Sequence, residues 1–172
     1  DWMVEVRSQR ELLGTLEGAT RVRADWMHDA GFGATVDGAV GDAFDGGMRG
    51  DACAAWRLAQ GEAGALDLLA GARLESRAAQ AAFDATTDGL VALRARTVVA
   101  PRVDLECSFG AVGGDRIVPE AESALRVQLD DRWNLGLSAG WRGDRAPWDG
   151  GTRGDSEGPF GFAVRLGLSA EF

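Results

Sequence analysis

The sequence predicts an all-β fold: a closed, antiparallel, up-and-down transmembrane β-barrel, with ten strands expected and eight as the alternative count. Three observations predict it. Apolar residues occupy every second position along most of the chain, which places them on one face of each strand. No run approaches the ~18 apolar residues that a membrane-spanning helix needs. Short and long connections alternate, as they do in outer-membrane barrels, where closure leaves no unpaired sheet edge in lipid.

The composition narrows the class of protein. The 172 residues suffice for a single barrel domain, 1–172, with a sizeable core. The formal net charge of −9 argues against nucleic acid as a partner. Tyr is absent, so an aromatic belt must consist of Trp and Phe. Because the chain begins with Asp1, we expect that a signal peptide was removed.

The alternation can be followed strand by strand. The apolar rows run over Trp2–Ser8, Gly18–Trp26, Phe32–Val40, Met48–Leu58, Leu66–Leu74, Val91–Val99, Val103–Ala111, Ala121–Leu129, Trp133–Trp141 and Phe160–Phe172. The composition of Glu62–Asp84 favours a helix. A strand separates its apolar from its charged residues more cleanly, so we expect a strand there. The first strand is the second open assignment, and eight strands therefore stay as the alternative.

The connections alternate in length. Short turns are expected at Met27–Gly31, Gly61–Gly64, Ala100–Arg102 and Asp130–Arg132, and long loops at Ala79–Asp88, Gly113–Glu120 and Gly143–Gly158. Short turns at one end and long loops at the other are typical of outer-membrane barrels. An even strand count places both chain termini at the short-turn end.

Aromatic residues lie at the ends of the strands. Trp26, Phe32 and Trp133 are expected at the short-turn rim, Trp141 and Phe160 at the long-loop rim, and Phe172 ends the chain. Along the barrel axis, Trp133 to Trp141 spans ~20 Å and Phe160 to Phe172 spans ~30 Å, which bracket the ~25 Å apolar band expected of such barrels. The pattern predicts an interfacial girdle.

The polar faces of the strands carry similar numbers of Arg and carboxylate residues. The predicted lumen charge network comprises Arg21, Arg23, Asp37, Arg57, Arg73, Glu75, Arg94, Arg96, Asp104, Glu106, Glu122, Arg126 and Arg165. Planar Arg side chains suit paired contacts with carboxylates. Because a barrel of this size has little space beyond its side chains, we expect a filled lumen. The alternative is a narrow ion path lined by charge.

A soluble sandwich or lipocalin-like barrel also alternates, with its apolar row inside. Three features favour lipid on the apolar side. The polar row is rich in Gly, Ala and Ser, which suits a crowded lumen, the large aromatics lie at strand ends, and the last alternating strand stops at Phe172.

The last strand, Phe160 to Phe172, resembles the C-terminal signal that the barrel-assembly machinery reads, and the chain resembles the small Gram-negative outer-membrane barrels of the OmpA/OmpX type. The resemblance implies the outer membrane as the location. It also implies outer-membrane lipids and, during biogenesis, the barrel-assembly machinery as partners. Ten strands differ from the eight of that type.

No residue pattern predicts catalysis, a cofactor or a metal site. The motif Gly136-Leu137-Ser138-Ala139-Gly140 matches a hydrolase signature that works at a strand-to-helix turn, but here it lies inside a strand. His28, the single histidine, lies in a turn expected at the other end of the barrel. Cys53 and Cys107 fall on opposite faces of the sheet, so we expect two free thiols.

Two surface features are candidates for contacts with partners. Arg153, Gly154 and Asp155 lie in the longest loop and form a candidate adhesion loop. Small residues on the apolar rows, such as Ala52 and Ala70, offer a surface on which another membrane protein could pack.

The leading hypothesis is a non-enzymatic integral outer-membrane barrel with a charge-filled lumen and a structural, surface-contact or scaffolding role. The alternatives are a porin-like channel for ions or small solutes and an autotransporter-type translocation barrel, which needs a passenger upstream of Asp1. A lipid- or peptide-modifying enzyme is disfavoured because the sequence lacks a histidine-based constellation.

Overall fold

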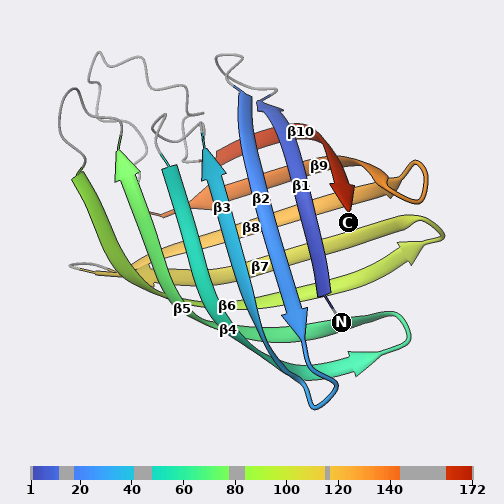
Figure 1. The fold of residues 1–172 in the computed structure, drawn as a ribbon, viewed down its shortest axis with the longest axis horizontal. Coiled ribbons are helices and arrows are strands. Elements are labelled where there is room, and N and C mark those ends of the chain that lie inside the picture. Colours follow the sequence, from blue (N-terminus) through green and yellow to red (C-terminus); the bar gives the residue numbers. More distant parts are fainter. Residues whose placement is uncertain are drawn as a thin grey trace.

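The computed structural model is a closed antiparallel barrel of ten strands (Figure 1). It describes residues 2–11, 18–40, 48–77, 84–114, 117–143 and 162–171. The strands are β1 (Trp2–Glu11), β2 (Gly18–Met27), β3 (Phe32–Val40), β4 (Met48–Gly61), β5 (Gly64–Arg77), β6 (Asp84–Ala100), β7 (Val103–Gly113), β8 (Ile117–Gln128), β9 (Trp133–Arg142) and β10 (Phe162–Glu171). Among these residues, no helix is long and apolar enough to cross a membrane.

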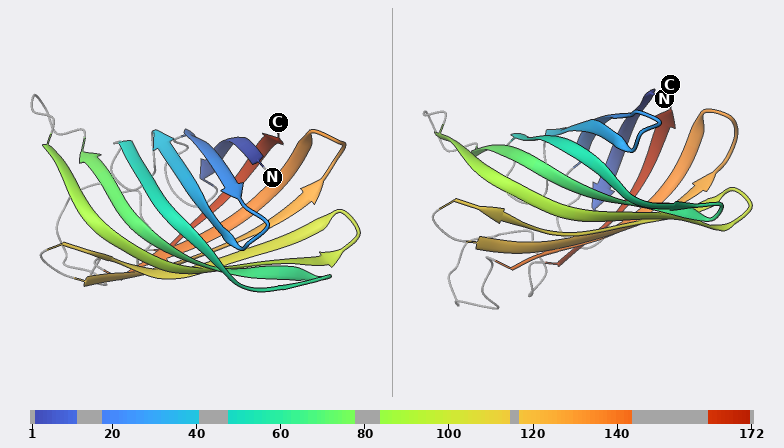
Figure 2. Two further views of the ribbon diagram at one scale, coloured as in Figure 1. Left: turned by 60° about the horizontal axis from the view of Figure 1, so that its bottom comes forward. Right: turned by 90° about the horizontal axis from the view of Figure 1, so that it is seen from below.

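Each strand pairs with its neighbours in the chain, and β1 pairs with β10 to close the barrel. In the closing pair Val6 lies opposite Ala170, and on the other side of β1 the same residue lies opposite Val22. β1 is therefore a full member of the sheet, which supports ten strands and removes the alternative of eight. Both chain termini lie at one end of the barrel, as predicted (Figure 2).

Most of the segment whose composition favours a helix, residues 64–77, forms β5. Its residues pair with β4 on one side and with β6 on the other, for example Ala70 with Ala54 and with Val91. Pairing along both edges satisfies its backbone donors and acceptors, and this outweighs the small helix preference of Ala, Leu, Arg and Glu.

The β6–β7 turn is tighter than predicted. It consists of Pro101 and Arg102 alone, with Ala100 opposite Val103, and the additional residue, Val99, forms a β-bulge in β6. Arg102 takes a left-handed φ of 66° in this turn. The predicted three-residue turn is wrong because alternation cannot distinguish an extra residue in the turn from one absorbed by a bulge.

Two of the predicted long loops overlap strands. β6 begins at Asp84, within the predicted loop Ala79–Asp88, and β8 begins at Ile117, within the predicted loop Gly113–Glu120. Pro119 lies near the start of β8, opposite Ala111, where a missing N–H is tolerated. The loop predicted at Gly143–Gly158 lies outside the described residues, apart from Gly143.

The strands bend sharply along their length (Figure 1). At Gly71 a Cβ atom would overlap the Ala52 carbonyl oxygen of β4, and at Gly110 a Cβ atom would lie 2.5 Å from the Val91 carbonyl oxygen of β6. These close approaches between strands require glycine, and they let the sheet curl into a small barrel.

Apolar residues lie on the outer face of the barrel, and charged residues lie on its inner face. Val36 and Leu137 on the outer face are 57% and 45% exposed, whereas Asp67 and Arg73 on the inner face are 0% and 1% exposed. One part of the inner wall is apolar: Cys53, Ala55, Leu69, Leu90 and Val112 pack together there. A charged interior within an apolar exterior is the arrangement of a barrel in lipid.

The β8–β9 turn is held by an aspartate. The Asp130 carboxylate accepts hydrogen bonds from the backbone N–H groups of Arg132 (2.8 Å) and Trp133 (2.9 Å). Both bonds favour the charged form, so they lower the pKa of Asp130 below its ordinary value.

We expect an NMR titration of the chain folded in micelles to give a pKa for Asp130 below the ordinary range of aspartate. Because the pKa is lowered in the folded state, the turn contributes stability above the unfolded-state pKa and loses it as the pH falls through the folded-state pKa. An ordinary pKa would show that the two backbone bonds do not form in solution.

Candidate functional site

The candidate site is the lumen, where three groups of Arg and carboxylate side chains follow one another along the barrel. The long-loop cluster comprises Arg49, Asp51, Arg73, Glu75, Glu120 and Arg142. The middle cluster comprises Arg21, Asp37 and Glu122. The short-turn cluster comprises Arg23, Asp25, Arg57, Asp67, Arg94, Arg96, Glu106 and Arg126.

Arg73 is the centre of the long-loop cluster. Its Nε and Nη2 atoms donate to the two oxygens of Asp51 at 2.7 and 2.9 Å. Its Nη1 and Nη2 atoms donate to the two oxygens of Glu120 at 2.6 and 2.7 Å. The first pair joins the neighbouring strands β5 and β4, whereas the second crosses the lumen to β8. One buried guanidinium thus connects opposite walls of the barrel.

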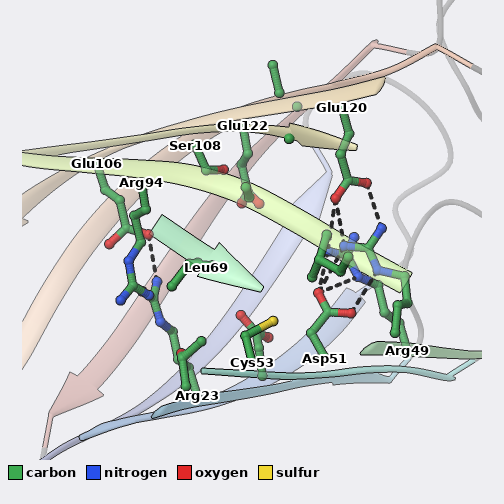
Figure 3. Close-up of a pocket in the computed structure, with 18 of the residues that line it drawn as sticks. Arg23, Arg49, Asp51, Cys53, Leu69, Arg94, Glu106, Ser108, Glu120 and Glu122 are labelled. Atoms are coloured by element: carbon green, nitrogen blue, oxygen red, sulfur yellow. Dashed lines mark hydrogen bonds and ion pairs between the residues drawn. The ribbon is translucent and has the colours of Figure 1, made fainter. Parts of the chain in front are cut away.

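Two further pairs complete the long-loop cluster. Arg142 Nη1 on β9 donates to Glu75 Oε1 on β5 at 2.7 Å, which is a second bridge across the lumen. Arg49 Nη2 donates to Asp51 Oδ2 at 2.8 Å (Figure 3). Every carboxylate of this cluster therefore has a short contact with an Arg.

The middle cluster depends on Arg21 of β2. Its Nε atom donates to both oxygens of Asp37 at 2.8 Å on the adjacent strand β3. Its Nη1 atom donates to Glu122 Oε1 on β8 at 2.8 Å, again across the lumen.

The short-turn cluster links β2 to β6 and β7. Arg23 Nη1 donates to Glu106 Oε1 at 2.6 Å, and its Nε atom lies 2.8 Å from Asp25 Oδ2. Asp25 Oδ1 also accepts from Thr35 Oγ1 at 2.5 Å and from Arg94 Nη1 at 3.0 Å. The fully buried Asp67 accepts from Arg57 Nε at 2.8 Å.

Two cavities adjoin these clusters. The central cavity, of about 100 Å³, lies between the long-loop and short-turn clusters, beside Cys53, Leu69 and Ser108 (Figure 3). The mouth cavity, of about 370 Å³, lies at the short-turn end, where the ends of β4 to β8 surround it. Glu106 borders both cavities, so the short-turn cluster forms the partition between them.

The structure places the predicted lumen residues on the inner wall. Arg21, Arg23, Asp37, Arg57, Arg73, Glu75, Arg94, Arg96, Glu106, Glu122 and Arg126 make the contacts described or ion pairs within the same clusters. Arg165 is buried and borders the central cavity, and Asp104 lies at the exposed edge of the mouth cavity.

Sequence reasoning missed Glu120, the partner of Arg73 across the lumen. The sequence interpretation places Glu120 at the end of a predicted loop, Gly113–Glu120. The continued alternation of Ile117, Pro119 and Ala121 could have extended β8 and placed Glu120 on the polar face. The polar face also carries Asp25, Asp51 and Asp67. Periodicity alone does not show that several Arg residues share each of these carboxylates.

The predicted girdle residues Trp26, Phe32, Trp133 and Trp141 lie on the outer surface. Phe32 packs edge-on against Trp26, with ring centroids 5.9 Å apart, and stacks on His28 at 4.8 Å. Trp56, which was not among the predicted girdle residues, pairs with Phe32 across β3 and β4 and is 45% exposed. Phe160, Phe172 and the candidate adhesion loop, Arg153 to Asp155, lie outside the described residues.

The groups that could suggest chemistry do not share a site. Ser138 is buried on the inner wall of β9, opposite Arg165. His28 lies in the exposed β2–β3 turn, where its Nδ1 atom accepts from Ala30 N. Within the described part of the chain no group of His, Cys, Asp and Glu residues could hold a metal ion. Cys53 is buried, Cys107 is exposed, and both are free thiols, as predicted.

No known family matches the sequence, and no curated protein matches it either. Solved structures do share the fold. A NanC porin matches with a TM-score of 0.52 and 10% identity, over 97% of this chain and 98% of that one. A KdgM porin matches with a TM-score of 0.51 and 9% identity, over 99% of both chains. The chain therefore has the fold of porin-type transmembrane β-barrels.

Proposed function

We propose that this chain is a non-enzymatic outer-membrane β-barrel with a closed lumen, which acts through its rigid wall and its loops as a structural, surface-contact or scaffolding component of the cell envelope. One observation carries the proposal: Arg73, which is 1% exposed, joins Asp51 on one wall to Glu120 on the opposite wall. A side chain bonded to both walls occupies the path that a solute would take.

The short-turn cluster supports the same conclusion independently. Arg23 and Glu106 join β2 to β7, and Arg94 joins β6 to Asp25 on β2. A permeating ion would have to displace ion pairs at both levels. Breaking a buried pair leaves an unpaired charge in surroundings of low dielectric constant, which is strongly unfavourable.

The fold and the outer face support a location in the outer membrane. A barrel with exposed Val, Leu and Trp on its outside suits a bilayer, and the solved structures that share its fold include porins. We place the chain in the outer membrane of a Gram-negative bacterium, inserted by the barrel-assembly machinery. The resemblance of the chain to the OmpA/OmpX class supports the structural role.

The test is conductance in a planar bilayer. We expect protein that is demonstrably inserted to give no steady, salt-dependent openings. Closure at three levels also predicts the behaviour of variants. Replacing Arg73 and Glu120 by glutamine, or Arg23 and Glu106 by glutamine, should still give no openings, because the Arg21–Glu122 bridge stays in place and the altered cluster keeps its second bridge, Arg142–Glu75 or Arg94–Asp25. Steady openings of the unmodified protein would refute the closed lumen.

The second candidate function is a narrow channel. The observation that favours it is the pair of cavities along the lumen, together with the fold shared with porins, one of which is described as a KdgM porin in complex with disordered oligogalacturonate. The same conductance measurement decides between the two functions, because a channel conducts without any substitution.

A further inference from the structure

The charge balance of the lumen differs between its two ends. In the long-loop cluster, Arg49, Arg73 and Arg142 face Asp51, Glu75 and Glu120. In the short-turn cluster, Arg23, Arg57, Arg94, Arg96 and Arg126 share the carboxylates of Asp25, Asp67 and Glu106. The short-turn cluster thus holds more Arg than carboxylate residues, although the border of the mouth cavity as a whole is balanced, with Arg57, Arg96 and Arg126 against Glu62, Asp104 and Glu106.

Arg96 carries most of this excess. Its closest contact with a carboxylate is 3.5 Å, from Nη2 to Asp67 Oδ2, and its contacts with Glu106 and Asp25 are 3.7 and 3.8 Å. Well-formed Arg–carboxylate hydrogen bonds are about 2.7–2.9 Å long. Asp67 is already bonded at 2.8 Å by Arg57, and Glu106 at 2.6 Å by Arg23. The carboxylates around Arg96 are therefore committed to other Arg residues.

The mouth cavity lies beside this side chain. Arg96 borders it together with Arg57, Arg126 and the potential donor Gln60. The Arg96 side chain is 28% exposed, against 20% for Arg57 and 10% for Arg126. Asp104 and Glu62 also border the cavity and are exposed at its outer edge. The inner part of the cavity thus carries three Arg side chains and one carboxylate, that of Glu106, which is bonded to Arg23, and the outer edge of the cavity is acidic.

We propose that the mouth cavity binds a small soluble anion, a carboxylate or phosphate group, on Arg96 between Arg57 and Arg126. The anion supplies the short contacts that the committed carboxylates do not, and a guanidinium holds either group with two parallel hydrogen bonds. The site opens at the short-turn end. Binding of the anion does not require that solutes cross the barrel, because the short-turn cluster closes the inner side of the cavity.

Isothermal titration calorimetry of the full chain, folded in detergent, tests the site with inorganic phosphate and succinate as probes. We expect saturable binding of both probes and a loss of affinity of at least about tenfold in Arg96→Gln, as expected for losing charged hydrogen bonds. Arg132→Gln is the matched control, because it removes the same charge from an exposed turn at the same end, outside the cavity. Its affinity should equal that of the unmodified protein.

Three results would overturn the proposal: no saturable binding, equal losses in Arg96→Gln and Arg132→Gln, or no loss in either. If Arg96→Gln does not fold, Arg96→Lys keeps the charge and removes only the paired geometry, and its affinity should still fall. Repeating the titration in phosphatidylglycerol and phosphatidylcholine vesicles separates a soluble anion from a lipid headgroup. If the probes bind with equal affinity in both kinds of vesicle, the site takes a soluble anion. If the probes lose affinity only in phosphatidylglycerol vesicles, the lipid phosphate occupies the site.

Discussion

Replacing Arg73 by glutamine should lower the free energy of unfolding of the barrel by about 3–5 kcal/mol, because it leaves buried carboxylates without their main partner. Arg73 is 1% exposed and makes four contacts of 2.6–2.9 Å with Asp51 and Glu120. Asp51 keeps Arg49, whereas Glu120 loses both of its short contacts. Denaturant unfolding of the refolded protein in vesicles measures the change.

The controls separate the ion pair from a general effect of removing a charge. Arg132→Gln, in an exposed turn, should change the free energy of unfolding by less than about 0.5 kcal/mol. Combining Arg73→Gln with Glu120→Gln should recover part of the loss, because the uncompensated charge on Glu120 is removed with its partner. Equal effects of Arg73→Gln and Arg132→Gln would mean that the bridge between β5 and β8 does not form in the membrane.

The second large effect concerns the outer face. Leu137 lies midway along β9, between Trp133 and Trp141, and is 45% exposed. Replacing it by Arg should cost about 2–4 kcal/mol of unfolding free energy in vesicles, because the charge enters the middle of the apolar band. Leu129 is similarly exposed but lies beside the β8–β9 turn, so the same substitution there should cost only about 0–1 kcal/mol.

The comparison of the two variants tests the membrane itself. In a water-soluble barrel both leucines would be surface residues, and Arg at either position would have a similarly small effect. A dependence on depth therefore requires lipid around β9. Equal, small losses for Leu137→Arg and Leu129→Arg would contradict a transmembrane orientation.

Alternation of apolar and polar residues was sufficient to predict the strands and which face of each strand meets lipid. A strand has a period of two, so a residue assigned to the outer face stays there as long as no bulge intervenes. The bulges at Leu58 and Val99 lie near the short-turn ends of β4 and β6, so the alternation is uninterrupted over most of each strand. The inner faces of the strands were therefore assigned correctly over most of their length.

The sequence by itself determined the strand-forming pattern, the outward apolar face and the balance of Arg and carboxylate residues, because each depends on neighbours only two positions apart in the chain. Only the tertiary structure decided which charges meet. Arg73 reaches Glu120, and Arg21 reaches Glu122, across a lumen whose shape depends on the registers of all ten strands together. The local cation excess around Arg96 has the same origin, since the residues that share Asp67 come from separate strands and meet only when the barrel closes.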